Sequence, residues 1–563
     1  MLFLMGASTG AAYAVSNPGI TDVKIAQQDG ACTGIVKDAT GETVIGASVV
    51  VKGTTNGTIT GIDGDFSLSN VKKGDVIVIS FVGYISQEIV WDGKPVNVTL
   101  KDDTQTLDEV VVVGYGTQKK VNVTGAVGMV DSKVIAARPV QNVSQALQGV
   151  IPGLNLTVGN SGGSLDGEMN INIRGTGTIG DGSGSSPLVL IDGIEGNLNT
   201  VNPNDIESVS VLKDAASASI YGARASFGVI LVTTKSGKSG KTNVNYSGNV
   251  RFNDAIGIPE LMDSYTFAQY FNRASSNRGG GDIFSPAVME RIKAYQEGTL
   301  TATTVDNGSG IWQKWANANG NTDWFGEFYD NWVPSQEHNL SISGGTEKLQ
   351  YVLSGSFLDQ KGLLRHGTDK FQRYTLNSKI TANITDWLKV TLNSKWTRED
   401  FQRPTYLTSS FFHNLARKWP VHPAYDPNGF PMDEGEIEQM ENGGEQNSQK
   451  DYYTNQLHVV IEPIKNWRIN LEGSVRTTTQ YQHWEVLPVH AYDVNGDPYY
   501  TVWDMGYGSY SAGSSRVDEY SWKENYYTTN IYSDYFKQFD NGHYFKVMAG
   551  FNAELYRTAV LKL

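Results

Sequence analysis

Hydrophobic and polar residues alternate with a two-residue period over most of the chain after residue 240. The clearest runs of this pattern lie at 340–344, 351–357, 374–384, 390–396, 457–461 and 469–475. Alternate residues of a β-strand point to opposite faces of a sheet, so each run predicts a strand with one apolar and one polar face. Strands of about ten residues or more are long for a globular protein, but typical of strands that cross a membrane obliquely.

The connections between these predicted strands alternate in length. Tight turns are expected at 345–348, 385–387, 463–466 and 539–542, and longer links at 253–335, 361–369, 402–450 and 487–516. Short turns on one side and long loops on the other are typical of an outer-membrane β-barrel. Residues 239–563 supply about nine strands, whereas plugged transporters use about 22. We therefore expect the first part of a barrel, cut off roughly halfway, which nine strands alone cannot close.

Tryptophans near the predicted strand ends fit two interpretations. They are Trp387, Trp396, Trp467 and Trp484. Such residues suit the aromatic girdles of a membrane barrel, but each also suits plain core packing. The long links carry further aromatic residues, namely Trp312, Trp315, Tyr406 and Tyr510. These either stack on sugar rings or pack against one another, so no residue is assigned to a substrate.

Residues 31–101 show a different sequence pattern, in which short apolar runs are separated by Gly, Asp and Asn. Strands are predicted at 35–36, 48–51, 66–68, 76–81, 85–90 and 96–100. Turns such as Asn56-Gly57 suit a small antiparallel sandwich. We interpret Asp63 and Asp65 as solvated turn residues rather than calcium ligands.

The segment 102–120 combines four consecutive valines, Val110–Val113, with polar and glycine-bearing flanks. A run of β-branched residues favours an extended strand over a helix. One interpretation is an ordinary buried strand of the preceding domain. The other is a docking peptide that adds a strand to the sheet edge of a partner. The linker-like flanks favour the docking peptide.

Residues 121–238 mix short strands with short helices. A helix is predicted at 143–150, and strands at 171–174, 188–191, 206–212 and 228–233. An Asp192-Gly193 turn follows the second of these strands. A helix of small residues at 215–221 is expected to lie close to its sheet.

Composition excludes several classes of protein. The 563 residues include 61 Gly, 28 Tyr and 12 Trp, which suits turns and aromatic anchors better than helical layers. The net charge of −14 argues against binding to a nucleic acid, which favours a positively charged protein surface. Cys32 is the single cysteine, so neither an internal disulfide nor a cysteine zinc site can form. We interpret it as a small strand residue.

The first fourteen residues are apolar or small and end in Ala12-Tyr13-Ala14. This segment is interpreted as the remnant of a secretory signal peptide, without its basic start. No later window has the 18 or more apolar residues of a membrane-spanning helix. We therefore expect an exported protein that is either water-soluble or a transmembrane β-barrel.

The sequence contains no recognisable catalytic, cofactor or metal-binding constellation. Residues 175–180 fit G-x-G-x-x-G, but a Gly/Ser run follows instead of a helix. Residues 159–163 fit G-x-S-x-G without the required flanking strand and helix. The eight histidines show no H-E-x-x-H spacing. We predict no enzyme activity, no cofactor and no metal.

Three motifs, in chain order, resemble those of one family. C-T-G-I-V-K-D, which begins at Cys32, and the G-D-F-S-L that follows resemble the carboxypeptidase regulatory-like domain, a non-catalytic immunoglobulin-like module. L-D-E-V-V-V-V-G-Y-G-T-Q-K-K, which begins at Leu107, resembles the TonB box of SusC-like transporters. I-E-S-V-S-V-L-K-D-A-A-S-A-S-I-Y-G, within residues 202–235, is similar to the plug motif of TonB-dependent receptors. The chain therefore resembles the N-terminal portion of a SusC-like TonB-dependent outer-membrane transporter (RagA/SusC family).

The resemblance implies a mainly β protein with five segments. They are a signal-peptide remnant at 1–14, an immunoglobulin-like regulatory sandwich at 31–101, the TonB box and linker at 102–120, an α+β plug at 121–238 and a partial antiparallel β-barrel at 239–563.

The same resemblance implies active import of an oligosaccharide, less often a peptide, across the outer membrane of a Gram-negative, Bacteroidetes-like bacterium. TonB, energised by ExbB and ExbD, would pair with the TonB box and pull on the plug, while a SusD-like lipoprotein covers the extracellular mouth. The residues implied to bind TonB are Leu107, Asp108, Glu109, Val110, Val111, Val112 and Val113.

Two other functions account for part of the sequence. A secreted or surface-exposed β-rich binding protein without transport activity would explain the N-terminal sandwich, but not the plug motif or the alternation of short and long connections. A carbohydrate-processing enzyme would need a carboxylate pair in a cleft, and no pair stands out in the sequence.

Overall fold

The computed structural model describes most of the chain in two compact units. The described residues are 30–38, 41–54, 56–81, 84–101, 110–113, 116–119, 126–138, 140–158, 164–165, 167–175, 186–501, 503–504, 509–510, 513–539 and 543–562. The first unit ends at Glu109 and the second begins at Val110. The predicted signal segment 1–14, the glycine motif at 159–163 and residues 176–180 of the glycine motif at 175–180 lie outside the described residues.

The first unit is a small β-sandwich. Its strands are β1 (Gly30–Lys37), β2 (Ser48–Val51), β3 (Gly57–Ile59), β4 (Asp65–Val71), β5 (Val76–Ser80), β6 (Gln87–Val90) and β7 (Val96–Thr99). They form two sheets with the orders β4-β1-β7 and β3-β2-β5-β6. Alternate side chains fill the core between them, and Cys32 is fully buried there, as expected of a small strand residue. The strand β3 was not predicted, because Asn56-Gly57 was interpreted only as a turn.

The second unit begins with a hairpin and a small α/β layer. The hairpin consists of β8 (Val110–Val113) and β9 (Gly116–Lys119). We call residues 126–234 the inner domain. Its strands are β10 (Val127–Asp131), β11 (Leu154–Val158), β12 (Met169–Ile173), β13 (Leu188–Ile191), β14 (Ile194–Glu195), β15 (Ile206–Leu212) and β16 (Val229–Thr234). Its helices are α1 (Ser132–Ala136), α2 (Val143–Leu147), α3 (Ala215–Ala218), η2 (Leu198–Thr200), η3 (Pro203–Asp205) and η4 (Ser219–Ala225).

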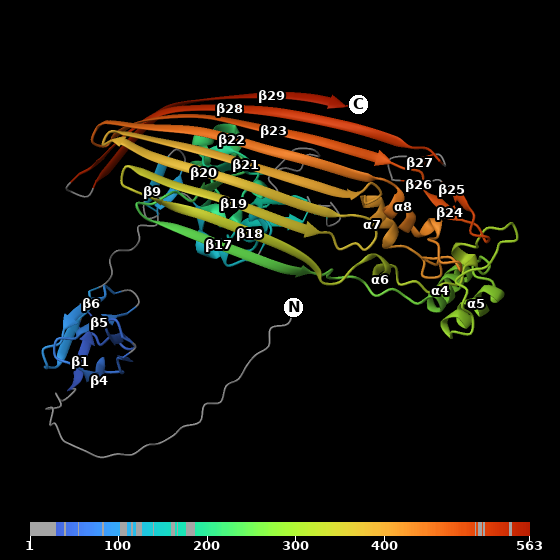
Figure 1. The fold of residues 1–563 in the computed structure, drawn as a ribbon, viewed down its shortest axis with the longest axis horizontal. Coiled ribbons are helices and arrows are strands. Elements are labelled where there is room, and N and C mark those ends of the chain that lie inside the picture. Colours follow the sequence, from blue (N-terminus) through green and yellow to red (C-terminus); the bar gives the residue numbers. More distant parts are fainter. Residues whose placement is uncertain are drawn as a thin grey trace, which may run out of the picture. The chain divides into compact units, whose positions relative to one another are not determined.

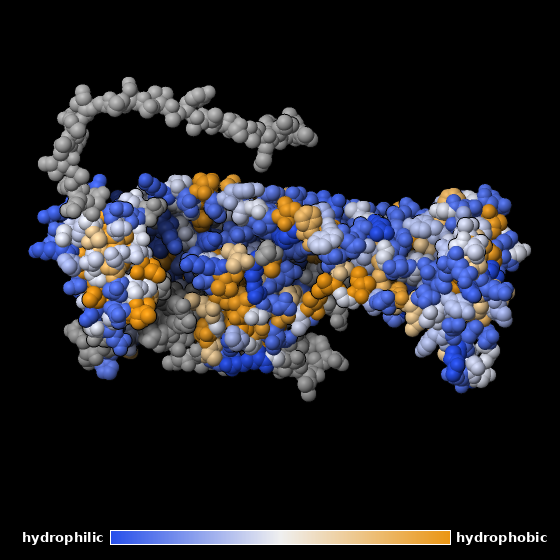
Figure 2. Space-filling view, turned by 90° about the horizontal axis from the view of Figure 1, so that it is seen from below, coloured by the Kyte–Doolittle hydropathy of each residue, from blue (hydrophilic) through white to orange (hydrophobic). Residues whose placement is uncertain are grey.

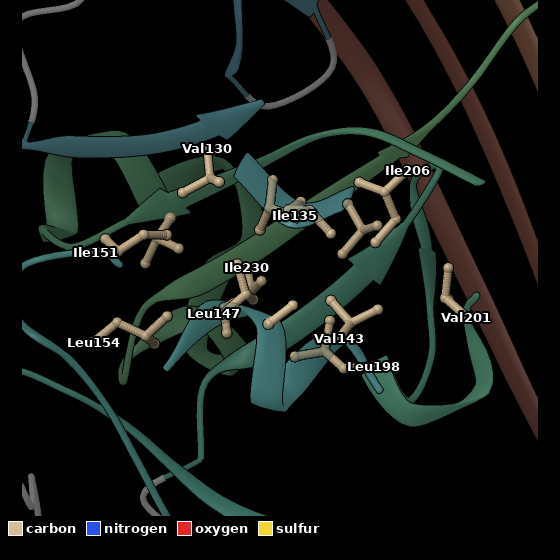
Figure 3. Packing of buried hydrophobic residues seen from close by; sticks show 14 of the residues in the cluster. Val130, Ile135, Val143, Leu147, Ile151, Leu154, Leu198, Val201, Ile206 and Ile230 are labelled. Atoms are coloured by element: carbon tan, nitrogen blue, oxygen red, sulfur yellow. The ribbon is translucent and has the colours of Figure 1, made fainter. Parts of the chain in front are cut away.

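Two apolar clusters, one on each side of the main sheet's strands, hold the inner domain together. Its main sheet has the order β10-β15-β16-β13-β14. Side chains from this sheet meet those of α1 and α2, as Ile206 and Ile230 do with Ile135 and Leu147 in Figure 3. Helix α2 begins after Asn142, whose side chain accepts a hydrogen bond from the backbone N–H of Gln145, 2.9 Å away. The predicted strands at 188–191 and 206–212 are confirmed, residue for residue.

Nine long antiparallel strands form the large sheet. They are β17 (Gly240–Asn253), β18 (Val333–Gly345), β19 (Leu349–Lys361), β20 (Lys370–Thr385), β21 (Leu388–Pro404), β22 (Glu445–Ile464), β23 (Trp467–Val486), β28 (Arg516–Gln538) and β29 (Tyr544–Lys562). Consecutive strands in this list pair with each other, so that β17 and β29 are the two edges and β23 pairs with β28. Figure 1 shows them side by side, with the short turns at one end and helices α4 to α8 beyond the other. The predicted strand count and the alternation of turn lengths are confirmed.

The large sheet has an exposed face that is apolar and a buried face that is polar. This is the reverse of the arrangement in a water-soluble protein. On β20, Thr375 is 1% exposed whereas the next residue, Leu376, is 58% exposed. Other exposed apolar positions are Tyr246, Leu340, Leu353, Leu392, Leu457, Leu471 and Ile531. Buried polar positions on the same strands include Glu337, Asn339, Arg373, Asn393, Gln456, Asn470 and Ser474. This reversal is the pattern of strands whose outer face meets lipid.

The long connections contain structure of their own. They carry α4 (Ser264–Asn277), α5 (Pro286–Gln296), η5 (Trp315–Asn317), α6 (Trp324–Phe328), α7 (Ser409–Leu415), η6 (Asp433–Gly435), α8 (Ile437–Asn442), β24 (His490–Tyr492), β25 (Pro498–Tyr500), β26 (Trp503–Asp504) and β27 (Ser509–Tyr510). Trp324, Phe328 and Phe411 are fully buried in one loop core. In Figure 2 the end that carries α4 and α5 is mainly hydrophilic, whereas hydrophobic residues gather over the strands and the inner domain.

Helices in the described part of the chain are too short or too polar to span a membrane.

Candidate functional site

Asp192 of the inner domain lies at the tip of a two-residue turn. Strands β13 and β14 pair up to Ile191 and Ile194, so Asp192 and Gly193 alone form the loop. Both have positive φ angles, 50° and 86°. A tight hairpin turn with two positive φ angles favours Asp-Gly, which explains the predicted turn at this position.

The carboxylate of Asp192 joins the inner domain to the large sheet. Thr234 of β16 donates to it through its backbone N–H (2.9 Å) and its hydroxyl (2.7 Å). From the sheet, Lys395 donates a hydrogen bond, the Lys379 ammonium lies 3.5 Å away, and Asn393 donates over 3.1 Å. The Asp192 side chain is only 8% exposed. Burial alone would raise the pKa of Asp192, but Lys395 and Lys379 hold this pKa well below its usual range.

A second set of contacts runs from polar sheet residues to the backbone of the inner domain. The buried guanidinium of Arg373 donates to the carbonyl oxygens of Asn199 and Gln141, both over 2.6 Å. The hydroxyl of Thr397 donates to the carbonyl oxygen of Thr200 over 3.1 Å. These bonds satisfy polar groups of the inner domain that would otherwise be buried without partners.

Further contacts reach Glu195 and Arg224 of the inner domain. The Arg224 guanidinium donates two parallel hydrogen bonds, of 2.6 and 2.7 Å, to the carboxylate of Glu554 on β29. The hydroxyl of Tyr556 donates to Glu195 over 2.8 Å, and Arg476 of β23 donates to the backbone carbonyl of Glu195. The inner domain is thus held by strands from both halves of the sheet.

The contact between the inner domain and the sheet is therefore mainly polar, and its apolar part is a small cluster in which Leu165 packs against Leu358, Phe371 and Phe401. Water can replace each of its hydrogen bonds when the two parts separate, whereas an apolar contact would expose surface that water does not solvate well. Such a contact can hold the inner domain in place and still allow it to move under load.

The predicted docking segment is described only in part. Leu107, Asp108 and Glu109 lie outside the described residues. Residues Val110–Val113 form β8 and pair with β9 across a two-residue loop.

The pairing of β8 fixes the directions of its backbone N–H groups. Residues that flank a two-residue loop form a hydrogen-bonded pair, here Val113 with Gly116, and such pairs alternate along an antiparallel ladder. The N–H groups of Val111 and Val113 therefore face β9, while those of Val110 and Val112 face the opposite edge. No described strand pairs with that opposite edge.

The aromatic residues considered for sugar stacking have different surroundings. Tyr406 is 4% exposed and belongs to the loop core. Trp315 stacks on His422, with ring centroids 5.0 Å apart. The side chain of Tyr510 lies outside the described residues. Of the four strand-end tryptophans, Trp387 and Trp467 are exposed beside the short turns, and Trp484 packs against the loop core.

Sequence reasoning missed the sheet residues that hold the inner domain. The inward, polar face of the sheet carries three charged residues among its neutral ones. They are Arg373 and Lys379 on β20 and Lys395 on β21. Charged residues at inward positions were a usable signal, because a charge inside a barrel needs a partner.

Two family descriptions match separate parts of the chain. The CarboxypepD_reg-like domain matches residues 32–112, and the TonB-dependent Receptor Plug Domain matches residues 119–229. The second match covers almost the whole inner domain.

Curated proteins with similar sequences are TonB-dependent receptors. The TonB-dependent receptor SusC of Bacteroides thetaiotaomicron is 37% identical over 375 residues, which cover 64% of this chain and 33% of SusC. A TonB-dependent receptor of Formosa agariphila is 33% identical over 393 residues, which cover 69% of this chain and 34% of that protein. The chain spans about a third of the length of these relatives.

Solved structures with a similar fold include two states of a peptide importer. The RagAB peptide importer in the open-open state gives a TM-score of 0.63 at 23% identity, covering 81% of this chain and 50% of that chain. Its closed-closed state gives 0.57 at 21% identity, covering 78% and 52%. The large sheet resembles part of a TonB-dependent barrel, with the inner domain in the place of the plug.

Proposed function

We propose that this chain, a relative of the SusC-like TonB-dependent receptors, takes part in the energised import of an oligosaccharide across the outer membrane. The family's usual cargo is an oligosaccharide, and a peptide is the second candidate because of the fold shared with a peptide importer. The partners in this proposal are TonB with ExbB and ExbD, the outer-membrane lipid and a SusD-like lipoprotein.

The reversed polarity of the large sheet supports this function most directly. Exposed apolar residues such as Leu376 and Leu392 suit contact with lipid, and buried polar residues such as Arg373 and Asn393 suit a hydrophilic passage. A secreted binding protein gives no reason for this arrangement, because its polar residues would face water.

The hairpin before the inner domain supports the part assigned to TonB. Strand β8 offers the N–H groups of Val110 and Val112 at an edge that no described strand occupies. An extended segment of TonB can add to such an edge by main-chain hydrogen bonds. The pull would then reach the inner domain, which is held by polar contacts such as that between Asp192 and Lys395.

An uptake experiment in cells tests the proposal. Cells that carry the gene, with its neighbours intact, are offered a fluorescent oligosaccharide library and a peptide library. We expect accumulation of oligosaccharides that stops when TonB is deleted or the proton gradient is dissipated. Equal accumulation with and without TonB would overturn the proposal.

A fractionation experiment separates import from the alternative of a secreted binding protein. We expect the protein to stay with outer membranes through salt and carbonate washes and to be released only by detergent. Recovery in the salt wash would favour the secreted binding protein.

A further inference from the structure

A groove lies on the outward face of the large sheet, near the strand ends that lead into the long connections. It has a volume of about 280 Å³, and strands β20 to β23 form its wall. Four of its lining residues are amides, namely Gln372, Gln402, Asn447 and Gln449, and the others include Lys370, Asp400 and Tyr481. We call this site the outer groove.

The register of the strands places the outer groove on the side away from the inner domain. Phe371 and Phe401 are partners on β20 and β21, and both pack in one cluster with Leu165 of the inner domain. Alternate residues of a strand point to opposite faces, so Gln372 and Gln402 point outward. Further groove residues share this face through the pairs Gln372 with Asp400, Asp400 with Gln449, Gln402 with Asn447 and Gln449 with Tyr481.

The outward face changes its chemistry in one direction along the strands. On β21 its positions from the apolar stretch onwards are Leu392, Ser394, Trp396, Arg398, Asp400 and Gln402. Their partners on β22 are Leu457, Asn455, Tyr453, Asp451, Gln449 and Asn447. An apolar stretch is thus followed by an aromatic row, by charged residues and then by amides. This is the order of environments that a barrel strand meets from the hydrocarbon to the headgroups of a membrane.

Strand geometry places the outer groove at the depth of the headgroups. Barrel strands rise about 3.3 Å per residue and tilt by about 45°, which puts Trp387 and Trp396 about 21 Å apart along the membrane normal. Trp387 lies beside a short turn, so these two tryptophans fit the borders of an apolar band about 25 Å tall. By the same geometry, Asp400 lies about 5 Å beyond that band, within the polar headgroup layer.

Neighbouring carboxylates orient the amide groups of the outer groove. Three amide nitrogens donate to carboxylates: Gln372 to Asp359 over 2.8 Å, Gln402 to Glu445 over 2.7 Å and Gln449 to Asp400 over 3.0 Å. These bonds occupy donors of the amides and leave acceptor capacity on their carbonyl oxygens. A wall rich in acceptors suits a ligand that brings hydroxyl donors, as a sugar ring does.

The charges of the outer groove argue against a phosphate. Among the residues that line it, Lys370 is the one cation, and its ammonium lies 3.6 Å from the carboxylate of Asp359. Arg398, on the same face of β21, donates two hydrogen bonds, of 2.8 and 2.9 Å, to Asp451. Phosphate binding favours cations that are free to pair with it, and both of these already have carboxylate partners. A headgroup without a negative charge is therefore the better fit.

The ring of Tyr481 and the size of the outer groove fit a single sugar. Tyr481 is 52% exposed, so its ring offers an apolar surface on which one face of a sugar can pack. The groove is slightly smaller than the roughly 300–1,000 Å³ of ordinary small-molecule sites, which suits one headgroup better than an extended chain.

We propose that the outer groove binds the uncharged sugar headgroup of a glycolipid in the outer leaflet, with Gln372, Gln402, Asn447, Gln449 and Tyr481 as its contacts. The site relies on the proposed function for the outer-membrane location of the sheet. It lies on the opposite face of the sheet from the inner domain, so its ligand is a lipid that surrounds the protein and not the imported cargo.

Lipid titration of the purified protein in detergent tests the outer groove. The probes are monoglucosyl diacylglycerol, phosphatidylglycerol and phosphatidylethanolamine with identical acyl chains, and native mass spectrometry measures the bound fraction of each. We expect monoglucosyl diacylglycerol to bind about ten-fold more tightly than either phospholipid, the effect of two neutral hydrogen bonds. Equal affinity for the three lipids, or tighter binding of either phospholipid, would overturn the assignment.

Substitutions of single amides locate the site. Gln449→Leu and Asn447→Leu should each weaken binding of monoglucosyl diacylglycerol by about five-fold, the effect of one neutral hydrogen bond. The matched control is Gln336→Leu, an exposed amide of β18 outside the groove whose partner Asp359 is in turn the partner of Gln372. We expect the control to bind like the wild type. Unchanged affinity in both groove variants, or an equal loss in the control, would overturn the assignment.

The outcomes distinguish the outer groove from the import function. Preferred binding of the glycolipid without TonB-dependent uptake would overturn import and leave the lipid site standing. TonB-dependent uptake by a protein that shows no preference among the three lipids would overturn the lipid site and leave import standing.

Discussion

The carboxylate of Asp192 accepts a hydrogen bond from the ammonium group of Lys395, a residue 203 positions later in the sequence. The first residue lies at the tip of a hairpin in the inner domain and the second on β21 of the large sheet. Lys379 approaches the same carboxylate within 3.5 Å, so one buried acid balances two lysines. This cluster joins the two parts through buried ion pairs.

We expect Asp192→Asn to weaken the attachment of the inner domain strongly. The substitution leaves Lys379 and Lys395 nearly buried without their counter-ion, and breaking a buried pair in this way costs about 3–5 kcal/mol. Urea titration of the protein folded in detergent, followed by limited proteolysis of the inner domain, measures the loss.

The backbone of the turn makes this substitution a clean test. Asn tolerates a positive φ nearly as well as Asp, so the Asp192-Gly193 hairpin should keep its backbone. The control is Glu88→Gln in the first unit, where Lys52 and Glu88 form an exposed pair worth about 0–1 kcal/mol. Equal stability of Asp192→Asn and the wild type would show that the cluster does not hold the inner domain.

The same cluster predicts how stability depends on pH. The folded-state pKa of Asp192 lies below the unfolded value of about 3.9, so its contribution is present above about pH 4 and is lost as the pH falls towards the folded pKa. Burial raises the pKa of Asp205, which acts in the opposite direction: it favours the folded state as its carboxyl takes up a proton.

Comparison of two proteins across pH isolates the effect of Asp192. We expect the difference in unfolding free energy between the wild type and Asp192→Asn to be constant from about pH 7 to 5 and to shrink below about pH 4. The contribution of Asp205 is common to both proteins and cancels. A difference that stays constant down to about pH 2 would contradict the lowered pKa of Asp192.

The large sheet was predictable from the sequence because its signal is local. The alternation of apolar and polar residues at 374–384 and 390–396 indicates which side chains of each strand share a face. The short segment 385–387 between these runs indicates that the two strands are joined by a tight turn. No fold-level knowledge is needed for either inference. The tight Asp192-Gly193 turn was predictable for the same reason, since its backbone angles depend on these two residues.

The contact of Asp192 with Lys395 was not predictable, because it depends on how two separately folded parts meet. The helices in the long connections are a different case, since their signals were present in the chain. Asp263 caps α4 by accepting from the N–H groups of Tyr265 and Thr266, both over 3.0 Å, and Ser285 precedes Pro286 at the start of α5. These caps identify helices within the segment 253–335, for which the sequence analysis predicts only a long link.

The hairpin of β8 and β9 predicts a difference between neighbouring proline substitutions. Val112→Pro removes an N–H group at the unoccupied edge, whereas Val111→Pro removes one that faces β9. If TonB adds to the unoccupied edge, Val112→Pro should lower TonB-dependent uptake by about ten-fold or more, and more than Val111→Pro does. Uptake of a fluorescent oligosaccharide, corrected for surface protein, measures both.

Val112→Thr is the control for the hairpin, because it keeps the N–H group and the branched side chain while removing apolar character. We expect it to import like the wild type. Equal losses in Val111→Pro and Val112→Pro would mean that the partner displaces β9. Unimpaired uptake in Val112→Pro would remove β8 from the interaction with TonB.

The exposed apolar face of the large sheet predicts the cost of placing a charge on it. Leu392 lies in the apolar stretch of β21, opposite Ile380 on β20 and Leu457 on β22. If this face meets hydrocarbon, Leu392→Lys should destabilise the protein by about 2–4 kcal/mol in phospholipid vesicles, the cost of a lysine near the middle of a bilayer. Denaturant titration of the vesicle-folded protein measures this difference.

Two controls separate lipid contact from a general loss of packing at Leu392. Leu392→Phe keeps the position apolar and should be nearly neutral, while Thr391→Lys places the same charge on the polar face and should cost less than Leu392→Lys. A water-exposed or weakly packed face would make all three substitutions equally mild, because a surface lysine changes stability by only about 0.5 kcal/mol or less. That result would contradict the membrane assignment and leave the secreted binding protein as the better account of the exposed leucines.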